Sequence, residues 1–242
     1  MNRTQVLTRY VAFGAFCAWA GQMAAAPNPN QPVPTPEWVQ ARLWRTMELQ
    51  DFRLEGVLRT SKSLHPLVMR TKGREMVYEF TERPLQIRVT MTPDGSRIER
   101  RAKASDPWRE VEGAARLERI LDSDLNYEDL GLDFIRWGDA RPLGTDRIKT
   151  LAAWAYEANP PGKSSYARAR FWISSEFMAV LRVDAMNERN QVIKRVEVNG
   201  VQQVGDHYVI KEMQISSLIP GRELSSSRTY IEIRRAEKGS GL

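Results

Sequence analysis

Residues 168–233 read RARFWISSEFMAVLRVDAMNERNQVIKRVEVNGVQQVGDHYVIKEMQISSLIPGRELSSSRTYIEI, and this stretch decides the fold. Apolar and polar residues alternate along it, as Phe171 and Ile173 do with Arg170. Turn-forming residues interrupt the alternation about every ten positions, at 187–190, 199–200, 205–206 and 220–221. This pattern predicts an antiparallel meander with one apolar face and one face toward water. The apolar face needs a cover, which the upstream sequence must supply.

The upstream sequence contains further segments with the same alternation, and the clearest of them is 85–91. Strands are expected at 52–59, 67–69, 76–80, 85–91, 97–103, 107–111 and 147–157. A sheet of this size must curl. The predicted fold is mainly β with some α: an incomplete, unclosed antiparallel β-barrel of about 10–11 strands, covered by helices.

Helical periodicity replaces the alternation in three places. Thr35 is expected to cap a helix that begins at Pro36 and ends near Leu49. A short helix is expected at 114–121, and Asn126 is expected to cap another. One face of that last helix would carry Tyr127, Leu130, Phe134 and Trp137, and its carboxylates would face water at Glu128, Asp129 and Asp133.

The N-terminus resembles a secretory signal peptide. Arg3 and Arg9 flank an apolar run, 10–20, that is too short to span a bilayer, although an uncleaved anchor is the alternative. The predicted organisation is a signal peptide (1–26), a Pro-rich linker (27–35), one domain (36–234) and a tail (235–242). The expected location is therefore an exported compartment. Removal of the two signal arginines leaves 34 basic and 30 acidic residues, a net charge of +4, which does not favour nucleic acid as a partner.

The sequence offers little for catalysis. Cys17, the only cysteine, lies in the predicted signal peptide, so no thiol chemistry or disulfide is expected afterwards. The two histidines, His65 and His207, have no nucleophile-elbow motif to accompany them. No metal-ligand spacing and no Gly-rich phosphate loop is present either. We expect neither an enzyme nor a cofactor. The apolar side of the sheet either packs solidly or leaves a cavity, and the pattern alone does not decide between them.

Several segments resemble the outer-membrane lipoprotein-sorting proteins, the LolA-like group of periplasmic carriers. A helix leads into the strand that begins FRLEG at Phe52, and LNYEDL (125–130) is followed by Phe134 and Trp137. Tyr166 precedes the Trp172-Ile173 pair, with Leu181-Arg182 and Lys194 further on, and YVIKEM (208–213) precedes a turn at Gly221. The resemblance extends over residues 36–234.

The resemblance implies an unclosed barrel whose helices cover a hydrophobic cavity for acyl chains, without a cofactor or catalysis. The expected cavity and lid residues are Trp38, Leu43, Met47, Leu54, Ile87, Val89, Met91, Leu130, Phe134, Trp137, Phe171, Ile173, Leu181 and Val183. Leu181 and Val183 are placed on one face because they are two positions apart. Arg83-Pro84 resembles the pair whose arginine latches the helical lid in the better known carriers.

The function expected from this resemblance is a monomeric periplasmic carrier that binds the acyl chains of lipoproteins or lipids and helps to sort them to the outer membrane. Its partners would include delivery proteins of the inner and outer membranes. The alternative is a non-catalytic module of the same fold that senses lipid or lipoprotein, or contacts a membrane protein. Activity that depends on His207 would instead indicate an enzyme.

Overall fold

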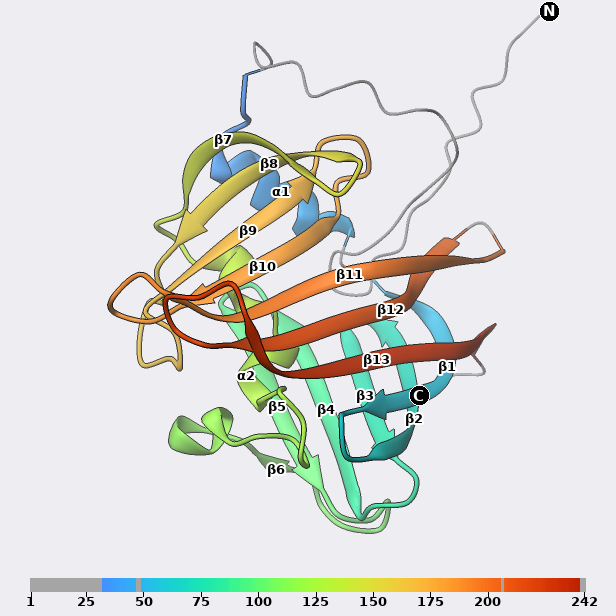
Figure 1. The fold of residues 1–242 in the computed structure, drawn as a ribbon. Coiled ribbons are helices and arrows are strands. Elements are labelled where there is room, and N and C mark those ends of the chain that lie inside the picture. Colours follow the sequence, from blue (N-terminus) through green and yellow to red (C-terminus); the bar gives the residue numbers. More distant parts are fainter. Residues whose placement is uncertain (1–31, 47–48, 206, 240–242) are drawn as a thin grey trace, which may run out of the picture.

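A computed structural model describes residues 32–46, 49–205 and 207–239. The described residues form one curved antiparallel sheet of 13 strands (Figure 1). The strand order is β6-β5-β4-β3-β2-β1-β13-β12-β11-β10-β9-β8-β7, so β6 and β7 are the two edges and are not paired with each other. The prediction of a mainly β, unclosed antiparallel sheet is confirmed, with more strands than expected.

The strands follow one another along the chain with short connections, except between β6 and β7. The first six are β1 (Leu49–Arg59), β2 (Leu64–Gly73), β3 (Glu75–Phe80), β4 (Leu85–Thr92), β5 (Gly95–Arg101) and β6 (Arg109–Glu110). The last seven are β7 (Arg141–Ile148), β8 (Leu151–Ala158), β9 (Arg168–Ser174), β10 (Val180–Met186), β11 (Val192–Val204), β12 (His207–Leu218) and β13 (Ser225–Lys238). The predicted strand at 147–157 corresponds mainly to β8, whereas most of β7 was not predicted because it is largely exposed and lacks an apolar alternation.

The chain enters the sheet at its centre and returns there at its end. Antiparallel pairing of β1 with β13, from Phe52↔Lys238 to Arg59↔Tyr230, joins the two halves. This pairing draws the first residues of the predicted tail into the sheet, since β13 continues to Lys238. The segment 111–140 connects the two free edges and therefore runs from one side of the opening to the other.

The connecting segment packs on the apolar face of the sheet. It contains the 3₁₀ helix η1 (Gly113–Leu117), the helix α2 (Tyr127–Leu130) and the 3₁₀ helix η2 (Asp133–Arg136). Leu125, Leu130 and Ile135 are buried in the same hydrophobic cluster as Leu54 of β1 and Ile173 of β9. The main core therefore lies between the sheet and this segment.

The predicted cap of α2 is confirmed, whereas its predicted length is wrong. Asn126 forms a capping box with Asp129, in which each side chain accepts a hydrogen bond from the other's backbone N–H. The helix ends after a single turn because Leu132 adopts a left-handed backbone, with φ of 50°. Gly131 lies against β5, where a Cβ atom would come within 2.9 Å of Ser96. The chain therefore packs closely on β5 at this point and does not continue as a helix.

The N-terminal helix α1 (Pro36–Thr46) packs one side into the core. Thr35 caps it as predicted, since the backbone N–H of Trp38 donates to its Oγ1 at 3.4 Å. Val39 and Leu43 are buried in the main cluster, and the phenolic OH of Tyr156 donates to the carbonyl of Pro34 at 2.9 Å. Within the described part of the chain, no helix combines the length and apolar character required to cross a membrane.

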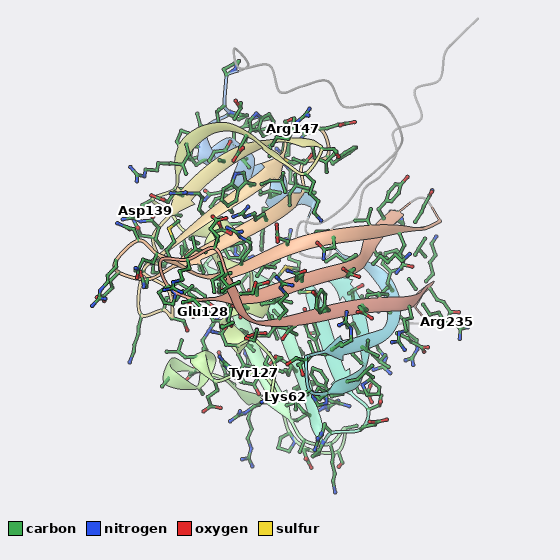
Figure 2. All side chains as sticks on the ribbon, viewed as in Figure 1. Lys62, Tyr127, Glu128, Asp139, Arg147 and Arg235 are labelled. Carbon is green, nitrogen blue, oxygen red and sulfur yellow. The ribbon has the colours of Figure 1, made fainter. Side chains whose placement is uncertain are left out.

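The outer face of the sheet carries the charge. Arg147 on β7 and Arg235 on β13 both project at the periphery (Figure 2). Arginines share buried carboxylates, both along a strand and across strands: Arg141 and Arg170 contact Glu157, while Arg182 and Arg195 contact Asp184. These pairs explain how a sheet rich in arginine stays folded without a large local repulsion.

Candidate functional site

A cavity lies between the apolar face of the sheet and the connecting segment. Its volume is about 60 Å³, and the space between its lining side chains is about 850 Å³ when the part open to solvent is included. The sheet contributes Met69, Met76, Tyr78, Ala169, Val183, Ala185, Lys194, Val196, Ile210, Met213, Ile231 and Ile233. Tyr166 and the segment residues Leu125, Asp129, Leu130, Leu132 and Phe134 complete the lining.

The alternation of the strands explains this composition. Residues two positions apart, such as Val183 and Ala185 of β10 or Ile231 and Ile233 of β13, project from the same face and reach the cavity together. The small side chains of Ala169 and Ala185 leave room that larger residues would fill. The result is an almost entirely apolar concavity on the inner face of a sheet whose outer face is polar.

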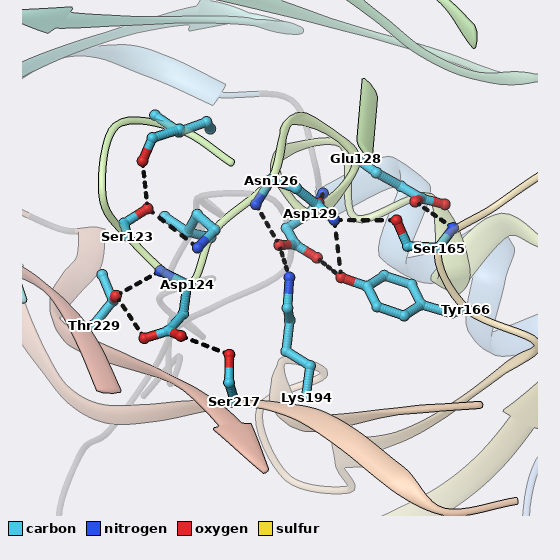
Figure 3. A network of polar contacts seen from close by, with 12 residues as sticks. Ser123, Asp124, Asn126, Glu128, Asp129, Ser165, Tyr166, Lys194, Ser217 and Thr229 are labelled. Atoms are coloured by element: carbon cyan, nitrogen blue, oxygen red, sulfur yellow. Dashed lines mark hydrogen bonds and ion pairs between the residues drawn. The ribbon is translucent and has the colours of Figure 1, made fainter. Parts of the chain in front are cut away.

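Two charged groups interrupt the apolar lining, and they are paired with each other. Lys194 Nζ of β11 lies 2.6 Å from Asp129 Oδ2 of α2 (Figure 3). Their side chains are only 11% and 7% exposed, respectively. Charges that are removed from water to this extent require a partner. The ion pair therefore fastens α2 to the sheet across the cavity.

Asp129 is further held by hydrogen bonds from both sides. The Tyr166 hydroxyl donates to Asp129 Oδ1 at 2.5 Å, and the backbone N–H of Asn126 donates to Oδ2 at 2.8 Å. Burial, and then the neighbouring Asp129 carboxylate, raise the pKa of Tyr166 well above its ordinary value. The phenol therefore stays protonated and remains a donor, and Lys194 Nζ lies 5.3 Å from the centre of its ring.

A second polar contact fastens the same segment nearer its start. The buried carboxylate of Asp124 accepts hydrogen bonds from Ser217 at 2.5 Å and from Thr229 at 2.9 Å (Figure 3). It also accepts one from Ser227. These hydroxyls belong to β12 and β13. Two buried carboxylates, Asp124 and Asp129, thus attach the segment to three strands of the sheet.

A family model described as "Uncharacterized protein" matches residues 103–242, which is more than half of the chain. The chain belongs to this family. No curated protein matches the sequence.

Solved structures show that the fold is LolA-like. A DUF1329 family protein from Desulfovibrio piger matches with a TM-score of 0.68 and 16% identity over 87% of this chain and 95% of that one. A putative outer membrane lipoprotein-sorting protein domain from Vibrio parahaemolyticus matches with a TM-score of 0.60 and 16% identity over 86% and 93% of the two chains. A LolA superfamily protein from Nitrosomonas europaea gives a TM-score of 0.56 and 12% identity over 80% and 87%. The suspected LolA-like family is therefore confirmed at the level of fold.

The residues predicted to line a cavity in this LolA-like fold divide into five groups. Leu130, Phe134 and Val183 line the cavity itself. Ile87 lines a smaller adjoining cavity of about 10 Å³. Packed in the main core without reaching the larger cavity are Leu43, Leu54, Val89, Met91, Trp137, Phe171 and Ile173. Met47 lies outside the described residues.

Trp38 and Leu181, the fifth group, lie away from the cavity, and Leu181 does not share a face with Val183 as predicted. Trp38 is 46% exposed on α1 and meets Trp154 edge-on. Leu181 packs with Trp172 in a small cluster on the opposite face of the sheet. The register of β10 against β9 shifts between Val180 and Arg182, so a bulge reverses the alternation and places Val180 in the core instead.

Arg83 is exposed in the turn between β3 and β4, and within the described residues its side chain forms no hydrogen bond to a helix. Its role as a latch stays a prediction. Other contacts hold helices to the sheet side of the molecule, among them the ion pair of Lys194 with Asp129 and the hydrogen bond that Arg74 donates to the carbonyl of Trp44 in α1.

Sequence reasoning missed Asp129, which was predicted to face water, and it did not place Lys194 in a site. A one-turn helix cannot keep a separate solvent face, and the capping role of Asp129 turns it toward the sheet. The signal for Lys194 was present in the strand itself. It lies two positions before Val196, on the apolar side of β11, where a lysine is out of place.

The contacts of His65 do not have the geometry of a catalytic triad. Ser63 Oγ and Asp122 Oδ1 both approach the same ring nitrogen of His65, Nε2, at 3.0 and 2.5 Å. A triad needs the serine and the carboxylate on different nitrogens. His207 meets Phe52 edge-on, with ring centres 5.8 Å apart. The described residues also contain no group of three or more His, Cys, Asp or Glu side chains that could hold a metal.

Proposed function

We propose that this protein is a non-catalytic periplasmic carrier that binds the acyl chains of lipoproteins or lipids in its cavity and helps to sort them to the outer membrane. The observation that carries this proposal is the apolar cavity between a curved sheet and a polar-anchored helical segment, in a LolA-like fold. Each methylene that enters such a cavity contributes about 0.8 kcal/mol, so an acyl chain needs few polar contacts.

Loading requires the cavity to widen. A volume of about 60 Å³ holds a few water-sized groups and not a whole acyl chain. The sheet is a continuous hydrogen-bonded ladder, whereas the segment 120–137 is attached to it mainly by side chains. We propose that this segment and α1 form the helical cover of the cavity, and that the segment moves away from the sheet to admit cargo.

The remaining parts of the proposal concern the cellular setting. The basic and apolar N-terminal residues support export by a cleaved signal peptide at 1–26. A monomeric carrier in the periplasm would take its cargo from one membrane and release it to the other, with a delivery protein at each. No separate cofactor is needed for such a cycle, because burial of the acyl chain supplies the binding energy.

A cavity-filling substitution tests the carrier function. Ala185 lines the cavity and Ala155 lies on the opposite face of the sheet, yet both are 6% exposed. Ala185→Leu should reduce uptake of a fluorescent acyl probe at least tenfold, whereas Ala155→Leu should leave it within twofold of the unchanged protein. Mass spectrometry of the purified full chain should also find co-purified lipid. No bound lipid together with no probe uptake would refute the carrier function, as would equal effects of the two substitutions.

A further inference from the structure

The cavity contains a cation whose partner is not part of the sheet. Lys194 belongs to β11, which pairs with β10 and β12, while Asp129 belongs to the one-turn helix α2 of the connecting segment. The ammonium group has three N–H donors. Within the described residues its side chain forms one hydrogen bond, to Asp129, so donors remain on the side of the cavity.

Opening the cavity would separate these two charges. If α2 moves away from the sheet, Lys194 is left in an apolar pocket without its counter-charge, which is strongly unfavourable. Asp129 is less affected, because the backbone N–H of Asn126 moves with it and continues to donate to it. Lys194 would therefore bind another anion favourably when cargo enters the cavity.

We propose that Lys194 recognises a carboxylate head group, so that the cargo is a single-chain amphiphile of the fatty-acid class whose carboxylate replaces that of Asp129. This inference rests on the acyl-binding function proposed above and specifies its ligand. A cargo carboxylate reproduces the group that Lys194 already binds, and the otherwise apolar lining suits the acyl chain attached to it. When the cargo carboxylate replaces that of Asp129 at Lys194, recognition of the head group is coupled to release of α2 from the sheet.

The affinities of two ligands of equal chain length test head-group recognition separately from acyl binding itself. The purified, delipidated full chain is titrated with dodecanoate and with 1-dodecanol below their micellar concentrations, in competition with an uncharged fluorescent acyl probe. We expect dodecanoate to bind at least tenfold more tightly, because a charge-assisted hydrogen bond to Lys194 is available only to the acid. Equal affinities would overturn the inference and leave the carrier function intact. Failure of both ligands and of the probe to bind would refute the carrier function instead.

Variants of the ion pair should change this preference in opposite directions. Asp129→Asn frees Lys194 while preserving an oxygen for the capping box, so dodecanoate should bind about tenfold more tightly to it. Lys194→Met should remove the preference for the acid and retain dodecanol binding. The double variant Lys194→Met/Asp129→Asn, which leaves no charge unpaired, gives the same readout if the single variant does not fold. Lys211→Met, at an exposed position of β12, is the matched control and should keep the preference. A retained preference without Lys194 would contradict the assignment.

Discussion

At the scale of single residues, this protein uses polar side chains in two distinct ways. Asp124 and Asp129 are buried and fasten the connecting segment to the sheet. Asp122, two positions before Asp124, is instead partly exposed and joins Ser63 and His65 of the loop and strand nearby. Hydrogen bonds from Ser63, and then from His65, lower the pKa of Asp122 to about 2. The Asp122 carboxylate is therefore ionised at neutral pH, and hydrogen bonds donated by its neighbours stabilise this ionised form.

The depressed pKa of Asp122 gives a pH dependence of stability. A carboxyl group whose pKa is lower in the folded state stabilises the fold above its unfolded pKa of about 3.9, and this contribution is lost as the pH falls toward 2. The melting temperature should therefore fall less steeply between pH 5 and pH 3 in Asp122→Asn than in the unchanged protein. Asp94→Asn, an exposed turn position, is the control and should follow the unchanged protein. Parallel curves for Asp122→Asn and the unchanged protein would show that the contact adds no stability.

At the scale of elements, the pairing of β1 with β13 joins the two halves of the sheet, and it depends on Gly56. The register shifts between Glu55 and Gly56, where the two backbones approach closely. A Cβ atom at position 56 would clash with the backbone carbonyl oxygen of Glu232. Because that obstacle is backbone rather than a flexible side chain, the strands can relieve it only by separating.

Gly56→Ala should consequently lower the free energy of unfolding by about 3 kcal/mol, the upper end of the cost of overpacking. Gly200→Ala is the matched control in β11, since a Cβ atom there would meet its nearest neighbour at an ordinary 3.8 Å. Its effect should stay within about 0.5 kcal/mol. Urea unfolding followed by circular dichroism measures both. Similar losses for the two alanines would mean that the β1–β13 bulge tolerates a side chain.

At the scale of the whole molecule, the topology places the connecting segment across the opening of the barrel. Because the first and last strands, β1 and β13, pair at the centre of the sheet, the segment between β6 and β7 must pass from one free edge to the other. The sheet is held by continuous backbone ladders, and the segment mainly by side chains such as the carboxylates of Asp124 and Asp129. If this segment is the cover proposed above, it should open at a lower free-energy cost than the sheet.

Hydrogen exchange should detect this difference on loading. Addition of an acyl ligand should increase amide exchange in residues 124–137 relative to the free protein and leave strands β3 and β4 unchanged, because only the segment must move. Ala185→Leu, in which the cavity is filled, should show no such increase. Unchanged protection of 124–137 with a ligand bound would indicate that the cavity loads by another route.

The antiparallel strands could be predicted from the amino-acid sequence, because alternation of apolar and polar residues is a local property of a strand with one buried face. The caps at Thr35 and Asn126, which involve residues only three positions apart, could be predicted as well. The likeness of LNYEDL (125–130), Tyr166 and Lys194 to lipoprotein-sorting proteins identified segments that the fold brings into one polar network.

The direction of individual side chains and the presence of a cavity depend on contacts between distant parts of the chain. The bulge that turns Leu181 outward arises from pairing between β9 and β10. Asp129 is buried because Lys194, 65 positions away, supplies its counter-charge. The cavity itself depends on the distance between the sheet and the connecting segment, which is set by close contacts such as Gly131 against Ser96. Such long-range contacts have no local pattern in the sequence, because they depend on how the complete sheet curves.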